Sequence, residues 1–217
     1  MAPRRMLITA GPTHEPIDAV RYLANRSSGR MGLAVAAAAR EAGWEVTLLL
    51  GPVPTDPPAD VTVHRYESTA QLQARLDEHF AAADVLVMAA AVADYRPRSA
   101  SGGGKIERQG EGLVLELEPT PDLVAGCAAR KRPDQFIVAF ALESPDVLEA
   151  RAVAKLQRKA VDAIVANPLA TMGDPRIDAM LLTAAGDRVA PGAMSKAEFA
   201  AWLVDQIAAR VVDAPRR

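Results

Sequence analysis

A short run of small polar residues near the amino terminus could bind an anion. Ser27, Ser28 and Gly29 come just before an alanine-rich stretch, residues 33–39, that is typical of a helix. Serine is a favoured helix cap, glycine allows a ligand to approach the backbone, and the first turn of a helix offers N–H groups at its positive end. The run is consistent with a phosphate site or with a capped helix on the surface.

Arginines surround this run. Arg21, Arg26 and Arg30 lie within ten residues of one another, with no acidic residue among them. They could neutralise a bound phosphate, or they could be solvated side chains that contribute little.

Polar side chains also lie where several predicted strands end. Asn25, Asp94, Glu143 and Asn167 are in or next to such loops. The carboxyl ends of parallel strands face the same edge of a sheet, and ligands of open α/β proteins bind there. We therefore expect these residues, distant in sequence, to converge on one pocket.

Lysines could supply positive charge to that pocket. Lys155 and Lys159 are four residues apart in a predicted helix, hence on one face and one turn apart. Two ammonium groups this close repel unless an anion lies between them or water screens them, and spacing alone favours the solvated alternative. Lys105 follows glycines 102–104 and is either a mobile surface residue or part of a lid over phosphates.

The motifs of several common enzyme classes are absent from the sequence. There is no G-x-x-x-x-G-K-[ST] loop, the glycines near the amino terminus do not follow G-x-G-x-x-G, and His14, His64 and His79 have no catalytic motif around them. What remains is an asparagine, an aspartate and lysines in a basic pocket. That set suits electrostatic stabilisation of a phosphorylated or adenylate-like transition state.

Composition restricts the partners. Lys and Arg number 25 against 27 Asp and Glu, a net charge of −2, so nucleic acid is not expected as a partner. Cys127 is the only cysteine, so no intrachain disulfide is possible and we expect a buried thiol. No stretch approaches the roughly 20 apolar residues of a membrane span, and the amino terminus lacks a signal-peptide core. We expect a cytoplasmic protein with no membrane partner.

The elements that would position these residues alternate between strands and helices. Short apolar runs predict buried strands at 6–10, 45–50, 61–64, 84–89, 136–141 and 163–166. Helices are expected at 29–42 and after residues 68, 120, 144 and 195. The pattern predicts an α/β fold: a doubly wound, mostly parallel Rossmann-like sheet with helices on both faces, in a single domain over residues 1–217.

Local signals mark the ends of the helices and two hairpins. Ser68 with Gln71, and Ser195 with Glu198, form capping boxes. Thr120, before Pro121, and Ser144 are expected as N-caps. Residues 105–108 and 112–118 predict one hairpin, and 179–183 with the residues up to 189 predict another. The first could pair with a second subunit or be a solvated hairpin.

Longer motifs carry a resemblance to a known family. They are I-T-A-G-P-T-H-E-P-I-D at 8–18, V-R-Y-L-A-N-R-S-S-G-R-M-G at 20–32, A-A-V-A-D-Y-R at 90–96, G-K-I at 104–106, T-P-D-L at 120–123 and K-L-Q-R-K at 155–159. In this order they resemble phosphopantothenoylcysteine synthetase, and the likeness extends from residue 6 to about residue 210.

The resemblance implies a ligase of coenzyme A biosynthesis that joins 4′-phosphopantothenate to L-cysteine. In the bacterial type, CTP activates the carboxylate as an acyl-cytidylate with release of pyrophosphate, and the amine of cysteine then displaces CMP. Mg²⁺ is expected on the triphosphate, and ATP is the alternative nucleotide. The resemblance also implies a homodimer formed through an added β-hairpin. Because many members are fused to a flavin-dependent decarboxylase, it implies either a free-standing chain with a separate phosphopantothenoylcysteine decarboxylase as partner or part of such a fusion.

The resemblance also assigns roles by position. Asn25 and Lys105 would be catalytic, Asn25 as a donor to the developing oxyanion and Lys105 on a flexible loop over the phosphates. Arg21 would reach the substrate of a neighbouring subunit, and no metal ligand is assigned. The substrate-binding set is Arg21, Asn25, Ser27, Ser28, Gly29, Ala90, Ala91 and Asp94. The nucleotide-binding set is Ala90, Asp94, Lys105, Asp122, Leu123, Val124, Phe140, Lys155 and Lys159.

A second hypothesis is a non-catalytic module that binds a phosphorylated ligand and partners a separate decarboxylase. Simple binding does not require Asn25, Asp94 and Lys105 together. The presence of all three favours the ligase.

Overall fold

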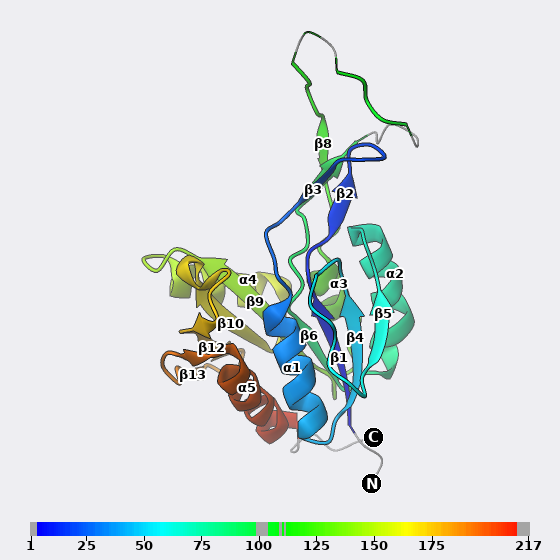
Figure 1. Cartoon of the computed structure of the whole chain (residues 1–217). Coiled ribbons are helices and arrows are strands. Elements are labelled where there is room, and N and C mark those ends of the chain that lie inside the picture. The colour runs from blue at the N-terminus through cyan, green and yellow to red at the C-terminus, as the bar shows by residue number, and fades with distance from the viewer. Residues whose placement is uncertain (1–3, 99–103, 109, 111, 212–217) are drawn as a thin grey trace.

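The computed structural model describes residues 4–98, 104–108, 110 and 112–211, and an eight-stranded sheet lies at its centre (Figure 1). The strand order is β13-β12-β10-β9-β6-β1-β4-β5, and every pairing from β10 to β5 is parallel. These parallel strands are β1 (Arg5–Ala10), β4 (Glu45–Leu50), β5 (Thr62–Arg65), β6 (Val85–Met88), β9 (Phe136–Glu143) and β10 (Ala163–Pro168). The antiparallel pair β12 (Met180–Thr183) and β13 (Arg188–Val189) forms the other edge.

Helices cover both faces of the sheet, which confirms the predicted fold class (Figure 1). Strand β1 shows why, because its alternate residues point to opposite faces. Met6 and Ile8 pack in the core beneath α1 and α5, whereas Leu7 packs in the core beneath the other three helices. The helices are α1 (Arg30–Glu41), α2 (Thr69–His79), α3 (Leu123–Ala129), α4 (Leu148–Lys159) and α5 (Lys196–Val211), with the 3₁₀ turns η1 (Phe80–Ala82) and η2 (Leu169–Thr171).

Two small antiparallel pairs extend beyond the carboxyl ends of the parallel strands (Figure 1). They are β2 (His14–Pro16) with β3 (Tyr22–Ala24), and β7 (Tyr95–Pro97) with β8 (Leu117–Pro119). We call these four strands, the turn at 17–21 and the described residues between β7 and β8 the arm. A further pair, β11 (Arg176–Ile177) with β14 (Met194–Ser195), lies near the start of α5.

The arm replaces the hairpin expected from residues 105–108 and 112–118, so that prediction is wrong. Residues 105–108 form no strand, and β8 pairs with β7 instead. The acidic residues of the second segment pair with arginines there: the Arg96 Nε donates to the Glu118 carboxylate at 2.8 Å, and the Arg98 Nη1 lies 3.7 Å from the Glu116 Oε2. The hairpin predicted between 179 and 189 is confirmed as β12 with β13.

The predicted helix ends are partly confirmed. The Ser68 Oγ accepts from the Gln71 N–H, and Ser195 and Glu198 exchange both bonds of a capping box. Thr120 is not an N-cap: the cap of α3 is Asp122, whose side chain accepts from the Ala125 N–H, and the Thr120 hydroxyl donates to the Ala93 carbonyl instead.

Ser144 does not cap α4 either, because the chain first makes a turn in which the Val147 N–H donates to the Ser144 carbonyl. Among the described helices, none combines the length and the apolar character needed to cross a bilayer.

Candidate functional site

The loop that follows β6 is held against the loop that follows β1. The Ala90 N–H donates to the Thr9 Oγ1 at 3.0 Å, and the Ala93 N–H donates to the Thr13 Oγ1 at 2.9 Å. Between them, the Ala91 N–H donates to the Gly11 carbonyl at 2.9 Å. Both threonines are fully buried. Since a buried polar group is costly to leave without a partner, these bonds fix the backbone at 90–93 in one conformation.

This loop forms one wall of a pocket of about 320 Å³ at the carboxyl end of β6. The remaining walls come from the segment leading into α3, the middle of β9 and one face of α4. All residues predicted to bind the nucleotide line this pocket except Lys105, namely Ala90, Asp94, Asp122, Leu123, Val124, Phe140, Lys155 and Lys159. Segments far apart in the sequence therefore meet in one cavity at the carboxyl edge of the sheet. Of the four residues expected to converge there from the strand ends, only Asp94 lines the pocket, so that expectation is wrong for Asn25, Glu143 and Asn167.

The lysine pair is not a solvated face. The Lys155 Nζ donates to the Phe140 carbonyl at 2.7 Å, and the Lys159 Nζ lies 2.9 Å from the Asp122 Oδ2. Burial lowers the pKa of Lys155, the positive charge of Lys159 lowers it further, and nearby carboxylates oppose the shift without reversing it. Among the described residues, no carboxylate lies within ion-pair distance of Lys155. The pocket thus holds a partly desolvated ammonium group that an anion would stabilise.

The pKa of the Asp122 carboxyl also depends on its neighbours in the pocket. Burial alone would raise the pKa of its carboxyl, but the hydrogen bond from Lys159 and that from the Ala125 N–H outweigh burial, and the net pKa is lowered. Asp122 is therefore ionised and neutralises Lys159, which leaves Lys155 as the less compensated charge.

Asn25 lies beside this pocket at the end of β3. Its Nδ2 donates to the carbonyl of Val92, a pocket residue, at 2.9 Å, and the side chain is otherwise exposed. Its second N–H and its oxygen remain available to a ligand, because an amide has two donors and one acceptor. Asn25 does not itself line the pocket.

The start of α1 differs from the predicted serine cap. Gly29 is the N-cap, in a left-handed conformation with φ 70°, and no side chain caps the helix. The Ser27 Oγ accepts from the Gly29 N–H at 3.3 Å. Gly32 serves packing: a Cβ there would lie 2.5 Å from the Ala10 Cβ, so glycine allows α1 to cross close over β1.

Arg21 has an acidic partner that the sequence argument did not consider. The buried Asp18 lies three residues earlier and forms an ion pair with it. Arg21 therefore lies on the arm and does not line the pocket. Its guanidinium contacts Ile106, the residue after Lys105, and Lys105 does not line the pocket either.

Two other residues expected at the strand ends also lie outside the pocket. Glu143 pairs with Arg151 at 2.8 Å, and the buried Oδ1 of Asn167 has no partner among the described residues. Neither Glu143 nor Asn167 lines the pocket.

Three further polar residues shape this region and were missed from the sequence. Thr9, Thr13 and Asp18 are all buried. A short polar side chain inside an apolar segment, as Thr9 is in β1, is the signal that could have identified such residues, since it requires a buried partner.

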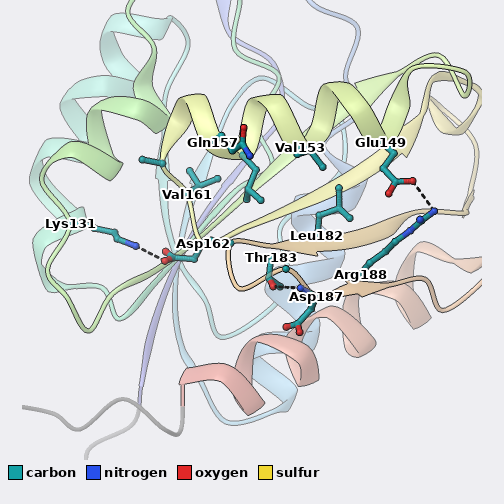
Figure 2. A pocket seen from close by; sticks show the side chains of 14 residues that line it. Lys131, Glu149, Val153, Gln157, Val161, Asp162, Leu182, Thr183, Asp187 and Arg188 are labelled. Atoms are coloured by element: carbon teal, nitrogen blue, oxygen red, sulfur yellow. Dashed lines mark hydrogen bonds and ion pairs between the residues drawn. The ribbon is translucent and has the colours of Figure 1, made fainter.

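A larger hollow of about 590 Å³ lies on the other side of α4, against β12 and β13 (Figure 2). Its charged side chains are paired: Lys131 with Asp162 at 2.5 Å, and Arg188 with Glu149 at 2.8 Å. None of the predicted site residues lines it.

The described residues contain no group of three or more His, Cys, Asp or Glu side chains that could hold a metal ion. This is compatible with Mg²⁺ carried by a triphosphate, because Mg²⁺ usually takes one or two carboxylates together with phosphates and water. Asp94, which lines the pocket, is a carboxylate in a suitable place.

A family model described as "DNA/pantothenate metabolism flavoprotein C-terminal domain" matches residues 1–211. The chain belongs to this family. A solved structure of the same kind, the C-terminal domain of coenzyme A biosynthesis bifunctional protein CoaBC, superposes with a TM-score of 0.84 at 34% sequence identity, covering 97% of each chain.

The curated relatives of this chain are longer proteins. CoaBC of Mycobacterium tuberculosis (strain ATCC 25618 / H37Rv) is 40% identical over 223 residues, which cover 95% of this chain and 52% of the relative. A protein named cysteine/cysteine sulfinic acid decarboxylase, from an unknown prokaryotic organism, is 45% identical over 171 residues, covering 78% of this chain and 47% of the relative. The chain spans about half the length of the curated relatives that it matches.

Proposed function

We propose that this domain is a phosphopantothenate–cysteine ligase, which forms 4′-phosphopantothenoylcysteine from 4′-phosphopantothenate, L-cysteine and CTP. The observation that carries the proposal is the single pocket in which almost the whole predicted nucleotide set meets, with Lys155 as a partly desolvated cation. The likeness to the C-terminal domain of CoaBC along 97% of both chains supports it.

The nucleotide would occupy the smaller pocket, which contains Lys155 and Lys159. Its triphosphate would gain the charge of Lys155, and it could draw Lys159 away from Asp122. Such charge-assisted bonds in a partly buried site are stronger than those in water. Mg²⁺ held by Asp94 and the phosphates would supply further neutralisation of the triphosphate. The choice of CTP over ATP rests on the family resemblance.

The chemistry requires that the carboxylate of phosphopantothenate attack the α-phosphorus of CTP, because a free carboxylate is a poor electrophile. A C–O–P bond forms, pyrophosphate leaves, and an acyl-cytidylate results. The amine of cysteine then attacks the acyl carbon, loses a proton to solvent, and CMP leaves. Asn25, anchored on the Val92 carbonyl, would donate its remaining N–H to the oxygen that becomes negative at the acyl carbon.

The proposal includes a homodimer formed through the arm. Large apolar side chains are exposed there, which is unusual for a surface that only meets water. Val114 is 87% exposed and Val20 is 64% exposed. The others on the arm are Tyr22, Leu23, Tyr95, Leu113, Leu115 and Leu117. A second copy of this chain would cover such a patch with the same patch under twofold symmetry.

A cytoplasmic location and a phosphopantothenoylcysteine decarboxylase, either as a separate partner or as part of the same protein, are also parts of this proposal. They rest on the sequence alone: a single cysteine, with no disulfide to suggest an oxidising compartment, and the family resemblance.

The test is to incubate the protein with 4′-phosphopantothenate, L-cysteine and Mg²⁺, adding CTP or ATP in separate reactions, and to measure pyrophosphate. We expect release that requires both phosphopantothenate and CTP. Phosphopantothenate binding by calorimetry without pyrophosphate from any nucleotide would contradict the ligase and support the non-catalytic module.

A further inference from the structure

The backbone on both sides of Lys105 is attached to the turn between β2 and β3. The Ala19 N–H donates to the Gly104 carbonyl at 3.3 Å. The Ile106 N–H donates to the Asp18 Oδ2 at 3.1 Å, and the Arg21 Nη2 donates to the Ile106 carbonyl at 2.9 Å. Three hydrogen bonds therefore hold a three-residue segment whose central residue is Lys105.

Asp18 is the centre of this arrangement. Its side chain has no solvent exposure. The Oδ1 accepts from the Val20 and Arg21 N–H groups, each at 2.8 Å, and the Oδ2 accepts from the Arg21 guanidinium and the Ile106 N–H. A buried carboxylate is tolerated only when its oxygens have donors, and here both oxygens have them. The Arg21 guanidinium, followed by the backbone N–H groups, holds the pKa of Asp18 well below its usual range, so the charge is constant at any working pH.

Lys105 itself is exposed and lies outside the pocket wall. A lysine on an otherwise unsupported segment would sample many positions, and the entropy of ordering it would reduce what it contributes to catalysis. Attachment of both neighbours to the turn at 17–21 removes most of that freedom and leaves the exposed side chain able to reach a ligand.

We propose that Asp18 is a positioning residue, which together with Arg21 fixes the backbone that presents Lys105. The catalytic role of Lys105 in this inference rests on the proposed function. The hydrogen bonds by which Asp18 holds the segment do not depend on that function. Asp18 acts through the backbone of Ile106 and through Arg21, because its own side chain has no surface exposed to a ligand.

Asp18→Asn separates the two roles of this carboxylate, which are to accept the N–H groups of the turn and to bind Ile106 and the Arg21 guanidinium. Asparagine is a favoured turn residue, so its Oδ1 can still accept from the Val20 and Arg21 N–H groups. Its amide NH₂, which replaces the Oδ2, cannot accept from Ile106 or from the guanidinium. The turn is kept and the bond from the Ile106 N–H is lost. The Arg21 guanidinium also loses the acceptor that orients it toward the Ile106 carbonyl, whereas the bond from the Ala19 N–H to the Gly104 carbonyl does not involve Asp18.

The decisive experiment is a double-mutant cycle on kcat for pyrophosphate release, with Asp18→Asn, Lys105→Gln and the double variant. We expect a loss of about 10- to 100-fold from Asp18→Asn, since displacement by about 1 Å has that order of effect. In the Lys105→Gln background the same change should cost less than about twofold, because residues that act as a unit are not additive. An equal loss in both backgrounds would overturn the proposal.

Asp60→Asn is the matched control. Asp60 also pairs with an arginine, Arg40, but both side chains are exposed and far from the arm. Its backbone has φ 59°, a conformation that asparagine tolerates well. This variant should keep wild-type kcat.

A second readout does not depend on turnover. Amide exchange measured by NMR should show the Ile106 N–H exchanging at least about tenfold faster in Asp18→Asn, with α1 and α5 unchanged. Unchanged exchange at Ile106 would overturn the proposal even if activity fell. If Asp18→Asn does not fold, Arg21→Lys, which cannot bridge Asp18 and the Ile106 carbonyl, should give the same acceleration. If the wild type releases no pyrophosphate, the ligase proposal fails, and the exchange rates still decide whether Asp18 positions this segment.

Discussion

The two hollows on either side of α4 differ in how their positive charges are compensated, and the smaller one holds the less compensated cation. The smaller pocket contains Lys155, whose ammonium group has a carbonyl as its partner and a lysine as its neighbour. The larger hollow contains Lys131 and Arg188, each matched by a carboxylate (Figure 2). Both are lined by the same helix, through different faces.

If the smaller pocket binds the nucleotide as proposed, charge compensation rather than volume distinguishes the binding site. A cation that already has a carboxylate gains little from a ligand, because the new bond replaces an existing one. A cation whose pKa is lowered by burial and by a like charge gains the full stabilisation when an anion binds. If this is right, changes on the two sides of α4 should have very different effects.

The largest effect is expected for Asn25→Asp. The change places a carboxylate where the proposed mechanism develops negative charge, and sets it against the Val92 carbonyl that accepts from Asn25 in the wild type. Loss of one such donor lowers kcat by about 10²–10³-fold. Because Asn25 is exposed, the thermal midpoint should move little.

The matched control for Asn25→Asp is Gln157→Glu, the same amide-to-acid change on the larger hollow. It should leave kcat within about twofold of wild type, since surface changes away from a site act weakly. A large loss of kcat from Gln157→Glu, or folding lost together with activity in Asn25→Asp, would break the comparison.

Lys155→Gln should come next. We expect kcat/KM for CTP to fall about 100-fold, because the variant removes the positive charge of Lys155 that would bind the triphosphate. A glutamine N–H can still donate to the Phe140 carbonyl. Lys131→Gln, on the larger hollow, should leave kcat/KM unchanged. Steady-state kinetics at one pH measures both, and equal losses would mean that α4 acts only as a structural element.

The pH dependence of kcat/KM tests the cause of the low Lys155 pKa. Activity should fall as pH rises through this pKa, because the cation is lost, and the fall should begin below the pH at which an ordinary lysine titrates, about 10.4. Lys159→Gln removes the neighbouring positive charge, so the pKa of Lys155 should rise and the alkaline limb should move to higher pH. A shift to lower pH would show that Lys159 does not act through its charge.

The sequence predicts the elements better than it predicts the partners of charged residues. Buried strands and amphipathic helices follow from local periodicity. The rule that parallel strands end at one edge predicts where the pocket lies in the fold, but of the strand-end residues to which it was applied only Asp94 lines the pocket. The pairing of β8 with β7 could not be read locally, because residues 105–108 and 95–97 both offered suitable partners and only the tertiary fold decides. Arg21 differs, because its partner Asp18 lies only three residues earlier and a local search for acidic residues could have found it.

Helix caps illustrate the same limit on a smaller scale. Thr120 and Asp122 are both good N-caps by type, and the choice of Asp122 depends on the Ala93 carbonyl, which takes the Thr120 hydroxyl. Gly32 is a further example, because its role in the close crossing of α1 over β1 depends on Ala10, a residue that is distant in the sequence. In each case the sequence shows the capacity of a residue, and the neighbours in space decide its use.

The smallest effect is expected for Arg188→Gln, which removes one ion pair of the larger hollow. Arg188 and Glu149 are 58% and 43% exposed in their side chains, so the pair is screened by water and its loss should lower the free energy of unfolding by less than about 1 kcal/mol. Urea denaturation measures this, and kinetics on the same protein should give wild-type kcat and KM. A changed KM for any substrate would mean that the larger hollow takes part in binding despite its paired charges, and charge compensation would then no longer separate the two sides of α4.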